Sequence, residues 1–125
     1  MSFKDPTQPL RDILESVRMI EAFTAGMNFE EFREDPKTVA AVERKFLVIG
    51  EAAVRLGREA PLIVADVPWR QIRDLGNMLR HAYDKVDLEI IWQTITDDLP
   101  PLKAAVLKAL QTPPDNPTAP GPGRS

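Results

Sequence analysis

The side chains with the clearest capacity for chemistry lie within residues 75–84. This stretch holds the only histidine and the only tyrosine of the 125-residue chain, His81 and Tyr83. Asn77 lies four positions before the histidine, and Arg80 directly precedes it. An imidazole exchanges a proton near neutral pH and can serve as a general acid or base. A neighbouring guanidinium can stabilise negative charge on oxygen. The combination indicates chemistry on a phosphate group.

Helical spacing places most of these polar residues on one stripe. Positions four apart on an α-helix differ by about 40° around its axis, so Arg73, Asn77 and His81 form a ladder with Arg80 beside it. Tyr83 lies about 200° from the histidine in an ideal helix and can join it only if the helix ends just before the tyrosine. A polar helix end with a tyrosine packed on the core has the same spacing, so a purely structural role stays open.

The composition excludes several kinds of site. The chain has no cysteine and one histidine, which argues against disulfides, thiolate sites and zinc sites, and we expect neither a metal nor a cofactor. The net charge is −3, whereas residues 69–85 carry four basic side chains against two acidic ones, so any nucleic-acid contact is local. No apolar run approaches the roughly 20 residues that cross a bilayer, and we expect a cytoplasmic protein without a membrane segment.

Apolar residues recur at spacings of three and four along most of the chain, which predicts an all-α fold: an up-and-down bundle of about four to five helices. Pro100-Pro101 is expected to cause a break or a sharp kink, with Pro101 near the start of a last helical piece. Residues 61–65 are the only strand candidate and are interpreted as a buried connection. The expected helices cover residues 7–27, 35–57, 68–82 and 88–110, with a short helical turn over 29–33.

Two further features concern the organisation of the chain. Gly50-Glu51-Ala52-Ala53 is a patch of small residues around one acid, and it would let a neighbouring helix approach closely. Five of the fourteen residues in 112–125 are proline, which predicts a disordered tail after a single helical domain over 1–111.

Three blocks of the sequence resemble the HepT-like toxins, a branch of the HEPN superfamily. The first is Leu10–Glu15 in the opening helix. The second combines 27–32 with 49–53 around Glu51. The third is Trp69–Ile72 leading to Asn77 and then to His81-Ala82-Tyr83. The three blocks occur in the family's order and spacing, and the resemblance covers about residues 8–110.

The resemblance implies an α-helical HEPN-like homodimer, with two active-site helices facing a shared cleft, that cleaves RNA without a metal. It also implies a partner, an MntA-like nucleotidyltransferase antitoxin in a toxin–antitoxin system, which attaches AMP to the tyrosine of the His-x-Tyr element. Carried over, His81 is the acid or base and Tyr83 the modification site. Asn77 would orient the phosphate or the imidazole, and Glu51 would hold an arginine or serve only in packing or at the surface.

The sequence departs from the family motif at one place. The motif arginine precedes the histidine by four to six intervening residues, and those positions hold Asp74, Leu75 and Gly76. Gly76 therefore takes the arginine's place, with Arg80 and Arg73 flanking the gap. Two alternatives stay open beside the ribonuclease: a HEPN module that binds a nucleotide or a partner without cleaving RNA, and a structural dimerising bundle.

Overall fold

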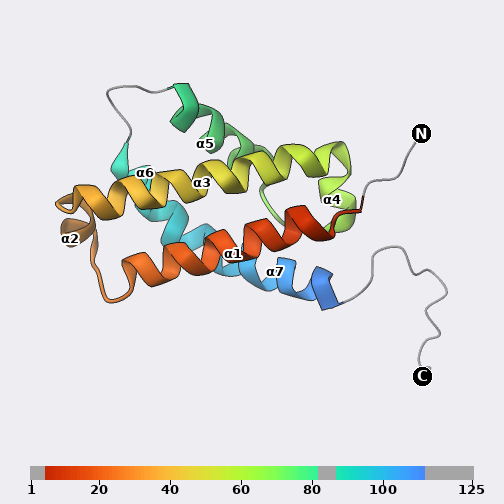
Figure 1. Cartoon of the computed structure of the whole chain (residues 1–125), viewed down its shortest axis with the longest axis horizontal. Coiled ribbons are helices and arrows are strands. Elements are labelled where there is room, and N and C mark those ends of the chain that lie inside the picture. Colours follow the sequence, from red (N-terminus) through yellow and green to blue (C-terminus); the bar gives the residue numbers. More distant parts are fainter. Residues whose placement is uncertain (1–4, 82–86, 112–125) are drawn as a thin grey trace.

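Helices make up nearly all of the computed structural model, which describes residues 5–81 and 87–111 (Figure 1). The described residues contain no strand, and the predicted all-α fold is confirmed. The helices are α1 (Thr7–Thr24), α2 (Phe29–Arg33), α3 (Pro36–Leu56), α4 (Ala60–Ile63), α5 (Trp69–His81), α6 (Leu88–Gln93) and α7 (Leu99–Gln111). A 3₁₀ turn, Gly57–Glu59, follows α3, and a π-helical segment, Thr94–Asp98, joins α6 to α7. Tyr83 and the predicted tail lie outside the described residues.

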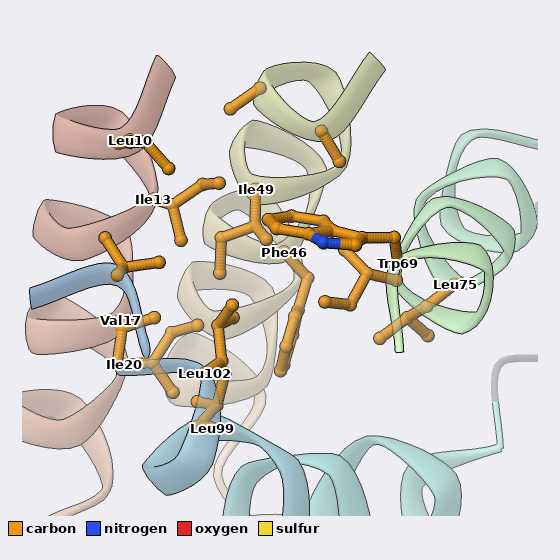
Figure 2. Packing of buried hydrophobic residues seen from close by; sticks show 14 of the residues in the cluster. Leu10, Ile13, Val17, Ile20, Phe46, Ile49, Trp69, Leu75, Leu99 and Leu102 are labelled. Carbon is orange, nitrogen blue, oxygen red and sulfur yellow. The ribbon is translucent and has the colours of Figure 1, made fainter. Parts of the chain in front are cut away.

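The central element is α3, which packs against α1 on one side and against α5 on the other (Figure 1). Figure 2 shows apolar side chains of α1, α3, α5 and α7 meeting in one core. Trp69 anchors the start of α5 there, and its indole Nε1 donates a hydrogen bond to the carbonyl of Val64 at 2.9 Å. The core therefore fixes one face of α5 and leaves the opposite face free.

Local sequence signals set where the helices begin. The Asp35 carboxylate caps α3 by accepting a hydrogen bond from the backbone N–H of Thr38 at 3.2 Å, and Pro36 takes the first helical position. Asp87 caps α6 in the same way through the N–H of Glu89. The predicted starts of these two helices are confirmed.

The predicted close approach of a helix to the small-residue patch of α3 is also confirmed. A Cβ atom added to Gly50 would lie 3.2 Å from the Cα of Gly76 on α5, and one added to Gly76 would lie 3.3 Å from the Cα of Gly50. Real Cβ atoms rarely come so close to backbone atoms. The paired glycines therefore set the separation of α3 and α5.

The interruption expected at the two prolines is a π-helical segment that precedes them, and the expected start of a last helical piece near Pro101 is confirmed by α7. The chain stays helical through them, because the π-helical segment Thr94–Asp98 leads directly into α7. The N–H of Leu99 donates to the carbonyl of Thr94, one residue further back than in an α-helix. Pro100 and Pro101 then occupy the first turn of α7, where a missing N–H is tolerated.

The expectation of a buried connection over residues 61–65 is corrected as well. Part of it forms the short helix α4, in which Leu62 is 85% exposed. Ala60 and Val64 are buried in the core and Ile63 packs against it partly buried, because a single helical turn can present just one face to the core.

Candidate functional site

The two faces of α5 differ sharply. Its apolar face packs on the core through the buried residues Trp69, Ile72, Leu75 and Gly76. Arg70, Asn77 and His81 are exposed on the opposite face, Arg80 is exposed near the end of the helix, and Arg73 is half-buried. The 3.6-residue period of the helix produces this division. The structure thus brings the predicted polar ladder to the surface of one helix.

A hydrogen bond joins two members of this ladder. The guanidinium Nη1 of Arg80 donates to the side-chain oxygen of Asn77 at 2.8 Å. The bond holds the arginine against its own helix, next to His81, the last residue of α5. Asn77 thereby orients a cation in the described chain, whereas its predicted contact with a phosphate or with the imidazole stays a prediction.

The second candidate cation, Arg73, lies farther from the histidine. Eight residues separate Arg73 from His81, which is about 12 Å along the axis of an α-helix. Arg80 is adjacent to the histidine in the same turn. One phosphate group can therefore meet Arg80 and His81 of one chain far more easily than Arg73 and His81.

Gly76, at the position of the missing motif arginine, faces α3 and not the side of the helix that carries His81. It is buried against Gly50 of α3, and five residues separate it from His81, which turns the two positions about 140° apart around the helix. The close packing of α3 and α5 leaves no room for an arginine side chain at this position. The close packing at Gly76 could have been suspected from the small residues around Gly50 on the preceding long helix.

Glu51 is exposed on α3, beside the glycine contact. The ion pairs among residues 5–81 and 87–111 join Arg33 to Glu30 and Glu34, Arg55 to Asp12, and Lys103 to Glu21, so none involves Glu51. The role expected for Glu51, holding an arginine in place, stays a prediction. Tyr83, the predicted modification site, lies outside the described residues.

A groove that the sequence did not predict lies beside the ladder. It has a volume of about 400 Å³ and is bounded by α3, α5, α6, the π-helical segment and α7. Three carboxylates line it: Asp74 of α5, and Asp97 and Asp98 of the π-helical segment. Burial, and then the charge of Asp97, raises the pKa of Asp98 above its usual value. The only sequence signal was the Asp97-Asp98 pair before the prolines.

Two further structural findings concern the described residues. No group of three or more histidine, aspartate or glutamate side chains among them could hold a metal ion. None of the helices described has both the length and the apolar character needed to cross a bilayer.

Comparison with known families decides the affiliation of the chain. The family model described as "Ribonuclease HepT-like" matches residues 13–109. The chain belongs to the HepT-like ribonuclease family. The resemblance inferred from the three sequence blocks is confirmed.

Curated relatives of this HepT-like chain agree with the family. A protein of Thermococcus cleftensis named "Probable ribonuclease HepT" is 38% identical over 94 residues, which are 75% of this chain and 86% of that protein. A "Putative RNase" of Caldanaerobacter subterraneus subsp. tengcongensis is 34% identical over 108 residues, covering 86% and 96%. A "Putative RNase" of Methanocaldococcus jannaschii is 39% identical over 100 residues, covering 80% and 83%. No solved structure matches the chain.

Proposed function

We propose that this HepT-like protein is an endoribonuclease that cleaves RNA without a metal ion. The observation that carries the proposal is the exposed cluster at the end of α5, where His81 adjoins Arg80 and Arg80 is held by Asn77. The names of the relatives, which describe ribonucleases, support the same activity. The proposal places the protein in the cytoplasm, together with its RNA substrate.

The mechanism uses the ribose next to the cleaved bond. His81 as base removes the proton of the 2′-hydroxyl, and the 2′-oxygen attacks the phosphorus. The bond from phosphorus to the 5′-oxygen breaks, and that oxygen takes up a proton from a general acid. The products are a 2′,3′-cyclic phosphate and a 5′-hydroxyl. Arg80 stabilises the charge that builds on the phosphate oxygens, with Arg73 as the more distant alternative.

A homodimer would supply the acid and the base together. Two copies of His81 facing one groove would let one imidazole accept a proton while the other donates one. The position of α5 supports this arrangement, because it packs mainly on α3 and leaves its polar face uncovered. A two-fold axis beside that face would bring the two ladders together.

The biological role we propose is that of a toxin, with a nucleotidyltransferase of the MntA kind as its antitoxin. The antitoxin would transfer AMP from ATP to the hydroxyl of Tyr83 and release pyrophosphate. Tyr83 is two residues after His81 in the sequence. A bulky anion at this place would exclude RNA by both volume and charge.

A second candidate function is a HEPN module that binds a nucleotide or a protein partner without cleaving RNA. The observation that favours it is the contact between Gly50 and Gly76, which leaves no motif arginine at that position. The two functions differ in one property. The binding module leaves RNA intact at any protein concentration, whereas the ribonuclease cuts it in excess chelator.

The experiment that tests the proposal is cleavage of a fluorescent RNA by the purified protein in excess chelator. His81→Ala is expected to lower the rate by about 10²–10⁴-fold, the usual contribution of a general acid or base. The matched control is Arg18→Ala, which removes an exposed charge from α1. Circular dichroism checks that both variants fold. Undiminished cutting by His81→Ala would rule out the assigned role.

A further inference from the structure

Asp74 is the one carboxylate of α5, and the proposed mechanism does not use it. It precedes His81 by seven positions, so the two residues lie only about 20° apart around the helix and about 10.5 Å apart along its axis. Both side chains are exposed. None of the ion pairs among residues 5–81 and 87–111 involves His81. The acid and the imidazole therefore share one stripe of the helix without meeting in the same chain.

No described element covers this stripe. The helix α5 packs mainly on α3, where Gly76 meets Gly50, and Figure 1 shows α5 on the outside of the bundle, with α3 between it and α1. Asn77 lies between Asp74 and His81 on the same side and is exposed as well. The stripe is polar, so a molecule that covers it must offer matching hydrogen-bonding groups and charges.

A second copy of the chain supplies such groups. Two α5 helices can lie antiparallel across a two-fold axis that passes between Asn77 and Met78, within the homodimer proposed above. Asp74 and His81 are equally far from this axis, on opposite sides of it. The carboxylate of each copy therefore lies opposite the imidazole of the other, and the contact occurs twice. Packed helices are about 8–10 Å apart, which allows facing side chains of this size to form hydrogen bonds.

Other positions of the axis leave the imidazole without an acid. An axis at Asp74 would set two carboxylates against each other, and an axis at His81 would set two imidazoles against each other. An axis midway between Arg70 and Asp74 would pair those two residues and leave His81 alone. Among these registers, the one centred between Asn77 and Met78 gives His81 a carboxylate.

The same register brings Arg73 near the chemistry. Arg73 and Arg80 lie on the flank of the stripe that is nearer to Gly76. Across the axis, Arg80 of one copy lies within about one helical turn of Arg73 of the partner subunit. These like charges repel each other until a phosphate group binds between them, and the two contacts of Asp74 with His81 offset that repulsion when RNA is absent.

We propose that two α5 helices pair antiparallel and that Asp74 accepts a hydrogen bond from the imidazole of His81 of the partner subunit. Asp74 is then a positioning residue, because its carboxylate fixes the orientation of the ring and decides which ring nitrogen carries the proton. The other nitrogen is left to exchange a proton with RNA. This role in cleavage rests on the proposed function, whereas the contact itself does not.

The contact is tested with introduced cysteines, because the chain has none of its own. Asp74→Cys and His81→Cys chains are co-expressed, mildly oxidised and separated on a non-reducing gel. A mixed dimer brings the two thiols together and keeps one native contact of Asp74 with His81. The mixture is expected to form a covalent dimer, since a disulfide needs Cα atoms about 4.4–6.8 Å apart. Either variant alone is expected to stay monomeric on the gel, because identical positions lie about 10.5 Å apart along the axis.

The matched control replaces Asp74→Cys by Arg70→Cys, one helical turn farther from the axis and also exposed. This variant is expected to form little covalent dimer with His81→Cys. The proposal is overturned if the first mixture forms no covalent dimer, if either variant alone does so equally well, or if Arg70→Cys is the better partner. The gel needs no RNA, so a native chain that leaves RNA intact while the first mixture crosslinks would refute the ribonuclease and keep the contact.

The positioning role is tested by the kinetics of RNA cleavage. Asp74→Asn is expected to lower kcat about tenfold without raising KM, and Asp74→Glu is expected to retain more of the native kcat. A carboxylate that only repels RNA gives the opposite result, since its removal lowers KM and leaves kcat unchanged. That second result would overturn the positioning role.

Discussion

At the scale of single residues, the candidate site consists of one imidazole and the cation beside it. Arg80 is fixed by Asn77, whereas Arg73 lies two helical turns away from His81. The sequence predicted all four positions from their spacing. It could not predict which arginine Asn77 binds, because that depends on side-chain rotamers that the spacing leaves open.

The hydrogen bond between Asn77 and Arg80 gives a prediction on RNA cleavage. Arg80→Ala is expected to lower kcat/KM about 100-fold by removing charge stabilisation. Asn77→Ala is expected to lower it about tenfold, because the arginine loses its orientation. Since Asn77 acts through Arg80, the double variant should be about as slow as Arg80→Ala alone.

The comparison of the single and double variants of Asn77 and Arg80 has a matched control. Gln111→Ala removes an exposed amide from the end of α7 and should leave kcat/KM unchanged. Losses that multiply in the double variant would show that Asn77 and Arg80 act independently, which would contradict the positioning role.

At the scale of elements, α5 is positioned by its contact with α3. The backbones meet at Gly50 and Gly76. Gly76→Val is expected to lower the free energy of unfolding by about 1–3 kcal/mol, the usual effect of overpacking, although valine is a better helix former than glycine. Urea denaturation measures the change. An arginine side chain at position 76 would meet the same backbone atoms of Gly50. Gly76→Arg is therefore expected to lower the free energy of unfolding and not to raise the rate of RNA cleavage.

The control for this prediction is Ala104→Val at an exposed position of α7. It introduces the same branched side chain into a helix without a close neighbour and should change the free energy of unfolding by less than about 0.7 kcal/mol. An equally small change in the free energy of unfolding for Gly76→Val would show that the two glycines do not set the separation of α3 and α5.

The N-terminus of α3 gives a prediction on pH. The hydrogen bonds from the backbone and side chain of Thr38 lower the pKa of Asp35 below its usual value of 3.8. A carboxyl whose pKa is lower in the folded state stabilises the fold above the unfolded value and loses that effect as the pH falls through the folded value. Asp35→Ala should therefore lower Tm at pH 7, and its difference from the native chain should shrink below about pH 3.8. A difference that is independent of pH would contradict the charged cap.

Sequence signals predicted most elements because they are local. Asp35 and Pro36 marked the start of α3, and periodic apolar residues marked α1 and α5. The π-helical segment was not predicted, because Pro100 and Pro101 indicate that the helix is interrupted but not the form that the interruption takes. Packing of Leu99 and Leu102 in the core keeps the chain helical there. The groove was missed for a related reason: it is formed by five separate elements whose arrangement no local pattern encodes.

At the scale of the whole molecule, basic and acidic side chains lie next to one another on α5 and at the groove beside it. The chain has a net charge of −3. Arg70 and Arg80 are exposed on α5, and Asp74 of the same helix lines the groove together with Asp97 and Asp98. The exposed arginines of α5 can therefore contact an RNA backbone, whereas the carboxylates that line the groove would repel it.

The exposed Arg70 gives a prediction on how RNA binding responds to salt. Arg70→Ala is expected to reduce the slope of log K against log salt concentration by about 1, because one phosphate contact is lost. Arg44→Ala, an exposed arginine on α3, should leave the slope unchanged. Filter binding with the His81→Ala protein avoids cleavage during the measurement. Equal slopes for the native chain and Arg70→Ala would place the RNA elsewhere.

The most direct test of the central claim identifies the ends of the RNA fragments by mass spectrometry after incubation in excess chelator. Attack by the 2′-oxygen, with His81 moving the proton, predicts fragments that end in a 2′,3′-cyclic phosphate and begin with a 5′-hydroxyl, formed about 10²–10⁴-fold more slowly by His81→Ala. Fragments with 5′-phosphate ends, or the same fragments formed at an undiminished rate by His81→Ala, would contradict this mechanism.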